Sequence, residues 1–152
     1  MPIKAIAYSS RAVPGLTHED IERLAARAAE FNMTAGVTGV LFFDGGRFFQ
    51  YIEGPEDGLR IAYSRIVGAN THTELQELGR GRTGHRVLPY WSMRALPAAP
   101  ALLATLIEGD WTLAEPGESD NFRSLEWLAT VVEPYVTAAN HDASPAAPVS
   151  SP

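Results

Sequence analysis

A β-hairpin is the feature of this sequence that most constrains its fold. Residues 36–43, GVTGVLFF, are rich in β-branched and aromatic side chains, and residues 47–53, RFFQYIE, are similarly apolar. The intervening DGG is a strong turn signal, because glycine supplies the positive φ that tight hairpin turns need. The pattern therefore predicts two antiparallel strands in the interior of a sheet.

One polar side chain interrupts the second strand of this hairpin. Gln50 lies between Phe49 and Tyr51, and alternation along a strand places it on the same face as Phe48 and Ile52. An amide carries two donor hydrogens and an acceptor oxygen, and burying them without partners costs a few kcal/mol. Gln50 therefore needs partners from elsewhere in the chain.

The remaining predicted elements complete an α+β pattern. Thr17 can N-cap a helix with Asp20 three residues on, and the apolar stripe of that helix extends to Asn32. In chain order we predict a strand at residues 3–10, a helix at 17–32, the hairpin at 36–53, a second helix at 55–66, and two more strands at 74–84 and 90–93. This is the ferredoxin-like order with one additional strand. We therefore predict a mixed five-stranded sheet with two helices on one face and the strand of residues 74–84 at an edge.

The C-terminal part of the chain is predicted to be helical and to end in a tail. Residues 101–109 favour a short helix stopped by glycine, and another helix is expected to start near Ser119 or Asp120. Two amphipathic helices need a surface to cover, most simply the open face of the sheet. From about His141 the chain is mainly Ala, Ser and Pro, which favours disorder. We expect a folded domain over residues 1–96, a helical extension over residues 97–140, and a disordered tail over residues 141–152.

Composition and missing motifs exclude several functions. The net charge of −6, with only scattered Lys and Arg, argues against a nucleic-acid partner. The chain has no cysteine, so thiolate metal sites and cysteine nucleophiles are excluded. Histidines at metal-ligand spacing, a Walker loop and GxSxG are also absent from the sequence, so neither a metal site nor hydrolysis is expected. Without a signal pattern or a membrane-spanning apolar run, we expect a cytoplasmic protein.

Three polar side chains fall on faces that are predicted to be buried: those of Tyr8, Asn32 and Gln50. The first and third strands are adjacent in the predicted topology and both helices cover one face, so these groups can converge between helices and sheet. They can satisfy one another or stray backbone groups. Alternatively, they can bind a planar heterocycle rich in amide-like groups, flanked by Leu24 and Ile66.

Four blocks of the sequence together resemble the BLUF family, blue-light sensors that use a flavin. They are AYSSRAVPGLTHEDI, NMTAGVTGVLFFDGGRFFQYIEGPED, YSRIVGANTH and LPYWSM. The resemblance runs from about Ile3 to Met93, and it implies a ferredoxin-like domain that binds FAD non-covalently between its two helices. It includes the order and spacing of Tyr8, Asn32, Gln50, Trp91 and Met93.

The resemblance also implies a role for each matched position. Tyr8 would give an electron and then a proton to the excited flavin, and Gln50 would bridge Tyr8 and the N5/C4=O edge of the ring. Trp91 and Met93 would report the switch to the last strand. The other positions that would hold the cofactor are Asn32 and Arg65 at the polar edge of the ring, Leu24 and Ile66 on its faces, and His72 near its outer portion.

Two positions depart from the family pattern. Ala69 stands where the family often has an aspartate, which removes one expected cofactor contact unless Asn70 supplies it. Phe31 stands where many relatives have a polar residue. Neither position belongs to the pair formed by Tyr8 and Gln50, so we expect photoactivity.

We expect a light sensor that is not itself an enzyme. The residues after Met93 are too few for a cyclase or phosphodiesterase domain, so the output would be altered binding to a separate effector protein or altered self-association. An exposed sheet edge is compatible with a homodimer or larger oligomer. Two alternatives stay open: a flavin-dependent redox enzyme, and a non-photoactive ligand-binding or acylphosphatase-like domain.

Overall fold

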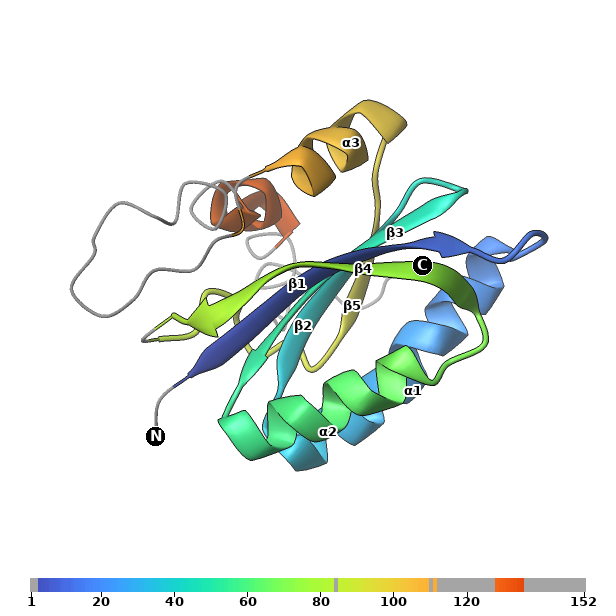
Figure 1. The fold of residues 1–152 in the computed structure, drawn as a ribbon. Helices are drawn as coiled ribbons and strands as arrows, with labels where there is room; N and C mark the ends of the chain where they lie inside the picture. The colour runs from blue at the N-terminus through green and yellow to red at the C-terminus, as the bar shows by residue number, and fades with distance from the viewer. Residues whose placement is uncertain (1–2, 84, 110, 112–127, 136–152) are drawn as a thin grey trace, which may run out of the picture.

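The computed structural model describes residues 3–83, 85–109, 111 and 128–135, which form one sheet with helices on both faces. The five strands lie in the order β4-β1-β3-β2-β5 (Figure 1). In chain order the elements are β1 (Lys4–Ala12), α1 (His18–Ala35), β2 (Thr38–Phe43), β3 (Arg47–Gly54), α2 (Glu56–Val67), β4 (His72–Arg82), β5 (Arg94–Pro97) and α3 (Pro100–Glu108). The predicted α+β, ferredoxin-like fold is confirmed.

The strand pairing matches the predicted topology. β1 pairs antiparallel with both β3 and β4, β3 pairs antiparallel with β2, and β5 joins β2 in parallel. β1 and β3 are therefore adjacent inside the sheet, and β4 is an edge strand, both as predicted. β1 continues past Ser10 to Ala12, beyond the polar residues that were expected to end it.

Two apolar layers enclose the sheet. On one face, β-strand side chains pack against α1 and α2; on the other, they pack against α3 and the helical residues 128–135 (Figure 1). β3 contributes to both, because Phe48 and Ile52 point into the first layer and Phe49 and Tyr51 into the second. The expected start of the last helix near Ser119 and the expected tail from His141 lie outside the described residues.

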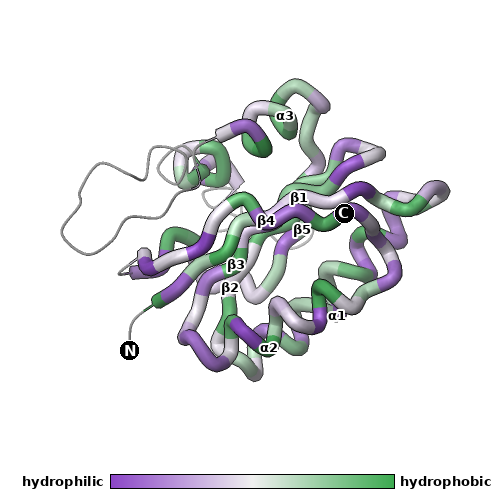
Figure 2. Tube along the Cα trace, in the orientation of Figure 1, coloured by the Kyte–Doolittle hydropathy of each residue, from purple (hydrophilic) through white to green (hydrophobic). Residues whose placement is uncertain are grey.

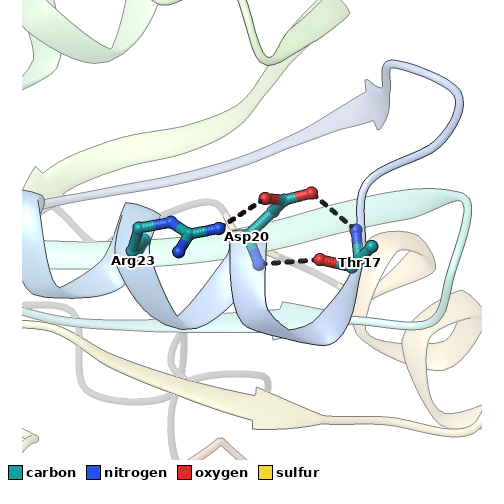
Figure 3. Close-up of polar contacts among 3 residues, drawn as sticks. All are labelled: Thr17, Asp20 and Arg23. Atoms are coloured by element: carbon teal, nitrogen blue, oxygen red, sulfur yellow. Dashed lines mark hydrogen bonds and ion pairs between the residues drawn. The ribbon is translucent and has the colours of Figure 1, made fainter.

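The first helix begins at the predicted cap. The Thr17 hydroxyl accepts a hydrogen bond from the Asp20 N–H at 3.0 Å, and the Asp20 carboxylate accepts one from the Thr17 N–H at 2.9 Å (Figure 3). Arg23 donates to the same carboxylate at 2.9 Å. These hydrogen bonds hold the pKa of Asp20 below its usual range. The reciprocal cap fixes where α1 starts and hence which of its residues face the sheet.

The prediction of a last strand at residues 90–93 is wrong, because β5 begins only at Arg94. The Trp91 N–H donates to the Pro89 carbonyl at 2.6 Å, which closes a tight turn. The carbonyls of Trp91 and Ser92 do not belong to a regular strand ladder. Trp91 O accepts a hydrogen bond from the Gly39 N–H at 2.8 Å, and Ser92 O accepts one from the Asn32 side chain at 2.7 Å. Local geometry thus overrides the strand propensity of the aromatic residues.

Helices α1 and α2 cross closely at a glycine. A Cβ atom added to Gly58 would overlap the backbone carbonyl of Ala35 at the end of α1. Both helices carry hydrophobic and hydrophilic residues along their length (Figure 2), and the buried ones include Ile21 and Ala25 of α1 and Leu59 and Ala62 of α2. No helix within the described residues is both long and apolar enough to cross a membrane.

We expect Gly58→Ala to separate α1 from α2, because a backbone carbonyl cannot move aside as a side chain can. Overpacking of this kind lowers the free energy of unfolding by about 1–3 kcal/mol, which chemical denaturation measures. Gly68→Ala is the matched control at the end of the same helix, since its Cβ would meet only atoms 3.7 and 3.9 Å away. Equal stability of the two variants would show that the helices are not in such close contact.

Candidate functional site

A cavity of about 60 Å³ lies between the sheet and the two helices α1 and α2. Its walls are mainly apolar, with side chains from β2, β3, α1 and α2. Five of the predicted site residues line it, namely Leu24, Gln50, Ile66, His72 and Met93. Leu24 comes from α1 and Ile66 from α2, so the two apolar side chains expected to flank a ring do come from the two helices.

A more open groove of about 330 Å³ adjoins this cavity and shares Leu24 and Ile66 with it. The predicted residues Asn32 and Arg65 line the groove, together with Arg27 and Asn70. No acidic residue is among the described residues that line it. The cavity and groove therefore form an apolar slot with a polar, positively charged mouth.

The two departures from the family pattern lie at this mouth. Ala69 lines both the cavity and the groove, and Asn70 lines the groove only. The guanidinium of Arg65 lies over the Phe31 ring, 4.2 Å from its centroid. Phe31 therefore supports Arg65 through a cation–π contact in place of a polar interaction.

Tyr8 and Gln50 face each other across the two central strands. They are directly paired residues of β1 and β3, so their side chains lie on the same face of the sheet. Tyr8 is fully buried, and its hydroxyl has no hydrogen-bond partner among the described residues. Burial, and to a smaller extent the nearby Tyr63, raise the pKa of Tyr8 well above its usual value. The phenol is therefore neutral and has a free donor and acceptor.

Gln50 contacts residues 86–93, which lead into β5. We call these residues the reporter segment. The Gln50 Nε2 donates to the Met93 Sδ at 3.7 Å, and Met93 is buried among side chains of the α1 and α2 layer. Trp91 instead packs against the opposite layer, with the guanidinium of Arg94 4.8 Å from its ring centroid. The two predicted relay residues thus lie in different layers of the molecule.

His72 connects the edge of the cavity to the second helix. Its Nε2 lies 2.8 Å from the Ile66 carbonyl oxygen, and its ring stands edge-on to Phe48 at 6.4 Å between centroids. The histidine therefore holds the start of β4 against the end of α2. The described residues contain no group of three or more metal-ligating side chains that could hold a metal ion.

Two further residues belong to the site although the sequence reasoning did not select them. Thr71 lines both the cavity and the groove. Gly39 lies under Met93, where a Cβ would come within 2.9 Å of the Met93 methyl carbon. Gly39 carried a usable signal, because a glycine inside a strand often marks the close approach of another group.

The donor set fits a flavin. An isoalloxazine ring is flat and apolar on its faces, and its carbonyl and N–H groups lie at one edge, where amides and a guanidinium can bond them. The slot supplies the apolar faces, Gln50, Asn32 and Arg65 supply polar groups, and the Tyr8 hydroxyl still lacks a partner. The geometry is that of a small α+β domain that binds a planar cofactor.

Comparison with known proteins gives the family. A family described as "Sensors of blue-light using FAD", the BLUF family, matches residues 3–94, which is more than half of the chain. The chain belongs to the BLUF family and contains its blue-light-sensing, flavin-binding domain, whose cofactor is FAD.

Individual relatives agree with this assignment. Photoactivated adenylate cyclase subunit beta of Euglena gracilis is 28% identical over 141 residues, 91% of this chain and 16% of that protein. The blue light- and temperature-regulated antirepressor BluF of Escherichia coli (strain K12) is 40% identical over 58 residues, 38% of this chain and 14% of that protein. The chain thus spans about a sixth of the length of these relatives. The dark-state structure of BlrB, a BLUF protein, shares the fold with a TM-score of 0.67, 23% identity, and coverage of 86% of this chain and 95% of that one.

We expect Gly39→Ala to displace Met93 from Gln50. The added methyl would come within 2.9 Å of Met93 and 3.0 Å of Ile52, and the flexible thioether chain is the easier of the two to move. The Met93 methyl resonance should shift in NMR spectra, and the free energy of unfolding should fall by about 1–3 kcal/mol. In a Met93→Ala background the same change should cost less. An equal cost in both backgrounds would show that Met93 does not occupy this space.

Proposed function

We propose that this chain is a light switch in which Tyr8 and Gln50 form the photoactive pair and the reporter segment carries the change to the C-terminal helices. The observation that best supports it is the pairing of Tyr8 with Gln50 on the central strands. Tyr8 has a buried hydroxyl without a hydrogen-bond partner among the described residues, and Gln50 places its amide at the cavity.

The residues that would hold FAD come from both helices and from β4. Leu24 and Ile66 would lie against the faces of the ring, Asn32 and Arg65 would bond its polar edge, and His72 would lie near its outer portion. Bound FAD would supply the absorption of blue light and an excited state that accepts an electron. The neighbouring protein groups must then provide that electron and handle the accompanying proton.

Tyr8 is the group suited to this transfer. Because burial raises its pKa, the phenol keeps its proton throughout the physiological pH range. Loss of an electron from a neutral phenol makes its O–H strongly acidic, so the proton leaves toward the nearest acceptor. The amide oxygen of Gln50, on the paired residue, could accept it if the amide gave up one of its N–H protons toward the bound ring, so that the amide stays neutral. Return of both the electron and the proton restores Tyr8, and the cycle consumes nothing.

Gln50 can convert this event into a change of contacts. Its amide N–H donates to the Met93 sulfur at 3.7 Å, and a thioether is a weak acceptor that has no hydrogen to donate. If the amide rotates so that its carbonyl oxygen faces Met93, this bond is lost, because neither the oxygen nor the sulfur has a hydrogen to donate. The state of the amide is thereby linked to the position of the reporter segment without any change in net charge.

The output is proposed to reach a separate effector protein or the oligomeric state of the chain. Trp91 packs in the layer that contains α3 and the helical residues 128–135, and Arg94 donates to the Tyr135 carbonyl at 3.4 Å. A relative described as an antirepressor supports signalling through another protein. These contacts provide a physical route from the reporter segment to the C-terminal helices.

We expect the purified protein to bind FAD, to shift its absorption to the red under blue light and to revert in the dark. Tyr8→Phe removes the electron and proton donor, and Gln50→Leu removes the amide, so each should abolish the shift while the flavin stays bound. Tyr63→Phe is the matched control: its ring lies 5.5 Å from that of Tyr8, yet it should retain the shift. Absorption spectra before and after illumination measure all four proteins.

Two outcomes would contradict this proposal. A normal red shift in Tyr8→Phe or Gln50→Leu would remove the assigned roles. A flavin-loaded wild-type protein without any spectral change would exclude a light switch and favour the alternative of a flavin-dependent redox enzyme.

Trp91→Ala tests the transmission step separately. Trp91 packs in the layer opposite the cavity, so its removal should leave the red shift intact. It should alter the rate of dark recovery, because the reporter segment loses one of its contacts with the α3 layer. Time-resolved absorption measures both quantities, and an unchanged recovery rate would eliminate Trp91 as a relay residue.

A further inference from the structure

A buried carboxylate holds the start of the reporter segment. Glu53 is fully buried and is the only buried acidic residue in the described part of the chain. It is the last residue but one of β3, three positions after Gln50, and it lies on the opposite face of the sheet together with Tyr51. The light-driven chemistry proposed above does not use it.

Four hydrogen bonds converge on this carboxylate. Oε1 accepts from the Tyr51 hydroxyl at 3.0 Å and from the Val87 N–H at 2.8 Å. Oε2 accepts from the Thr38 hydroxyl at 2.9 Å and from the Leu88 N–H at 2.8 Å. Because backbone N–H groups can only donate, and all four acceptor positions are used, this geometry fits an ionised carboxylate. Burial raises the pKa of Glu53 above its usual value, and the four hydrogen bonds only partly oppose that effect.

Arg86 strengthens the same junction. One guanidinium nitrogen donates to the Thr38 hydroxyl at 3.0 Å and to the Glu53 backbone oxygen at 3.4 Å, and the other donates to the Gly36 carbonyl at 2.6 Å. Residues 86–88 are therefore fixed to the ends of β2 and β3 by side-chain contacts.

The reporter segment depends on such contacts, because the described residues 86–93 form no strand. At its far end it is held by Gly39, Asn32 and Gln50, through the contacts to Trp91, Ser92 and Met93. At its near end the hydrogen bonds to Glu53 are charge-assisted, which makes them stronger than bonds between neutral groups. Without the near anchor, the short chain from Val87 to Met93 would not have a fixed starting point.

We propose that Glu53 is the positioning residue that holds the reporter segment so that Met93 reaches the amide of Gln50. The light-dependent effects expected from this inference rest on the proposed function. The placement of Met93 itself can be tested without flavin or light.

Glu53→Gln is the direct test, because it keeps the size of the side chain and replaces one acceptor oxygen with a donor. Either Val87 or Leu88 would then lose its acceptor. In the flavin-free, full-length protein, amide hydrogen exchange at these two residues should accelerate by about tenfold or more, as expected for loss of a bond to a charged group. The Met93 methyl resonance should shift in the same sample. In the flavin-loaded variant the red shift should still form, with a dark recovery rate that differs from wild type by about threefold or more.

Glu56→Gln provides the matched control. Glu56 is exposed and pairs with Lys4 at 3.3 Å, so the same substitution there should change neither hydrogen exchange at residues 87 and 88 nor the Met93 resonance. Should Glu53→Gln fail to fold, Glu53→Asp shortens the side chain by one methylene and so lengthens the bonds to the Val87 and Leu88 N–H groups, and the same measurements decide.

The outcomes separate the possible explanations. Faster exchange at Val87 and Leu88 together with a shifted Met93 resonance supports the proposal. Faster exchange with an unchanged Met93 resonance overturns it, because Glu53 would then stabilise the segment without positioning Met93. Unchanged exchange also overturns it. A wild-type protein that lacks the red shift would refute the light switch but would leave the flavin-free measurements fully decisive for Glu53.

Discussion

The antiparallel pairing of β1 with β3 is the constraint on which the whole site depends. Its register places Tyr8 opposite Gln50, and a slip of one residue would turn one of the two side chains to the other face of the sheet. Apolar packing on both faces fixes that register, because Ile6 pairs with Ile52 toward α1 and α2, and Ala7 pairs with Tyr51 toward α3. The hydrophobic core therefore also holds the phenol beside the amide.

β3 connects the two sides of the molecule. Gln50 faces the cavity, whereas Tyr51 and Glu53 face the opposite layer, so a single strand contacts both ends of the reporter segment. A close-packed sheet does not deform gradually. Movement is easier in a segment that is held by individual contacts, and the described residues 86–93 are such a segment. A change at the amide is thus expected to appear at the reporter segment before it appears in the strands.

The sequence predicted the sheet, because its elements follow from periodicity, whereas His72 and Met93 were expected at the site only through the family resemblance. Alternation along RFFQYIE correctly assigned Gln50 to one face, and the helical stripe correctly brought Asn32 to a buried position. Residues 90–93 were mispredicted as a strand, since their path is set by single hydrogen bonds to Asn32 and Gly39, sixty and fifty-two residues away in the chain. Glu53 was missed for a similar reason. A glutamate at the end of an apolar strand is visible in the sequence, but its four donors come together only in the folded structure.

Two contacts of the reporter segment, that of Glu53 with residues 87 and 88 and that of Gln50 with Met93, differ greatly in strength, and this difference suits a switch. At Glu53 a buried charge accepts four hydrogen bonds, and bonds of this type contribute about 1.5–3 kcal/mol each. At Met93 a neutral amide donates to a thioether sulfur at 3.7 Å, and sulfur is a weak acceptor. A carboxylate in place of Met93 would bind the amide too firmly for the two orientations of Gln50 to lie close in free energy. A two-state element responds to a modest input only if its states differ by a few kcal/mol. A firm contact at Glu53 and a weak contact at Met93 therefore let a small change at Gln50 move the Met93 side chain while residues 86–88 stay in place.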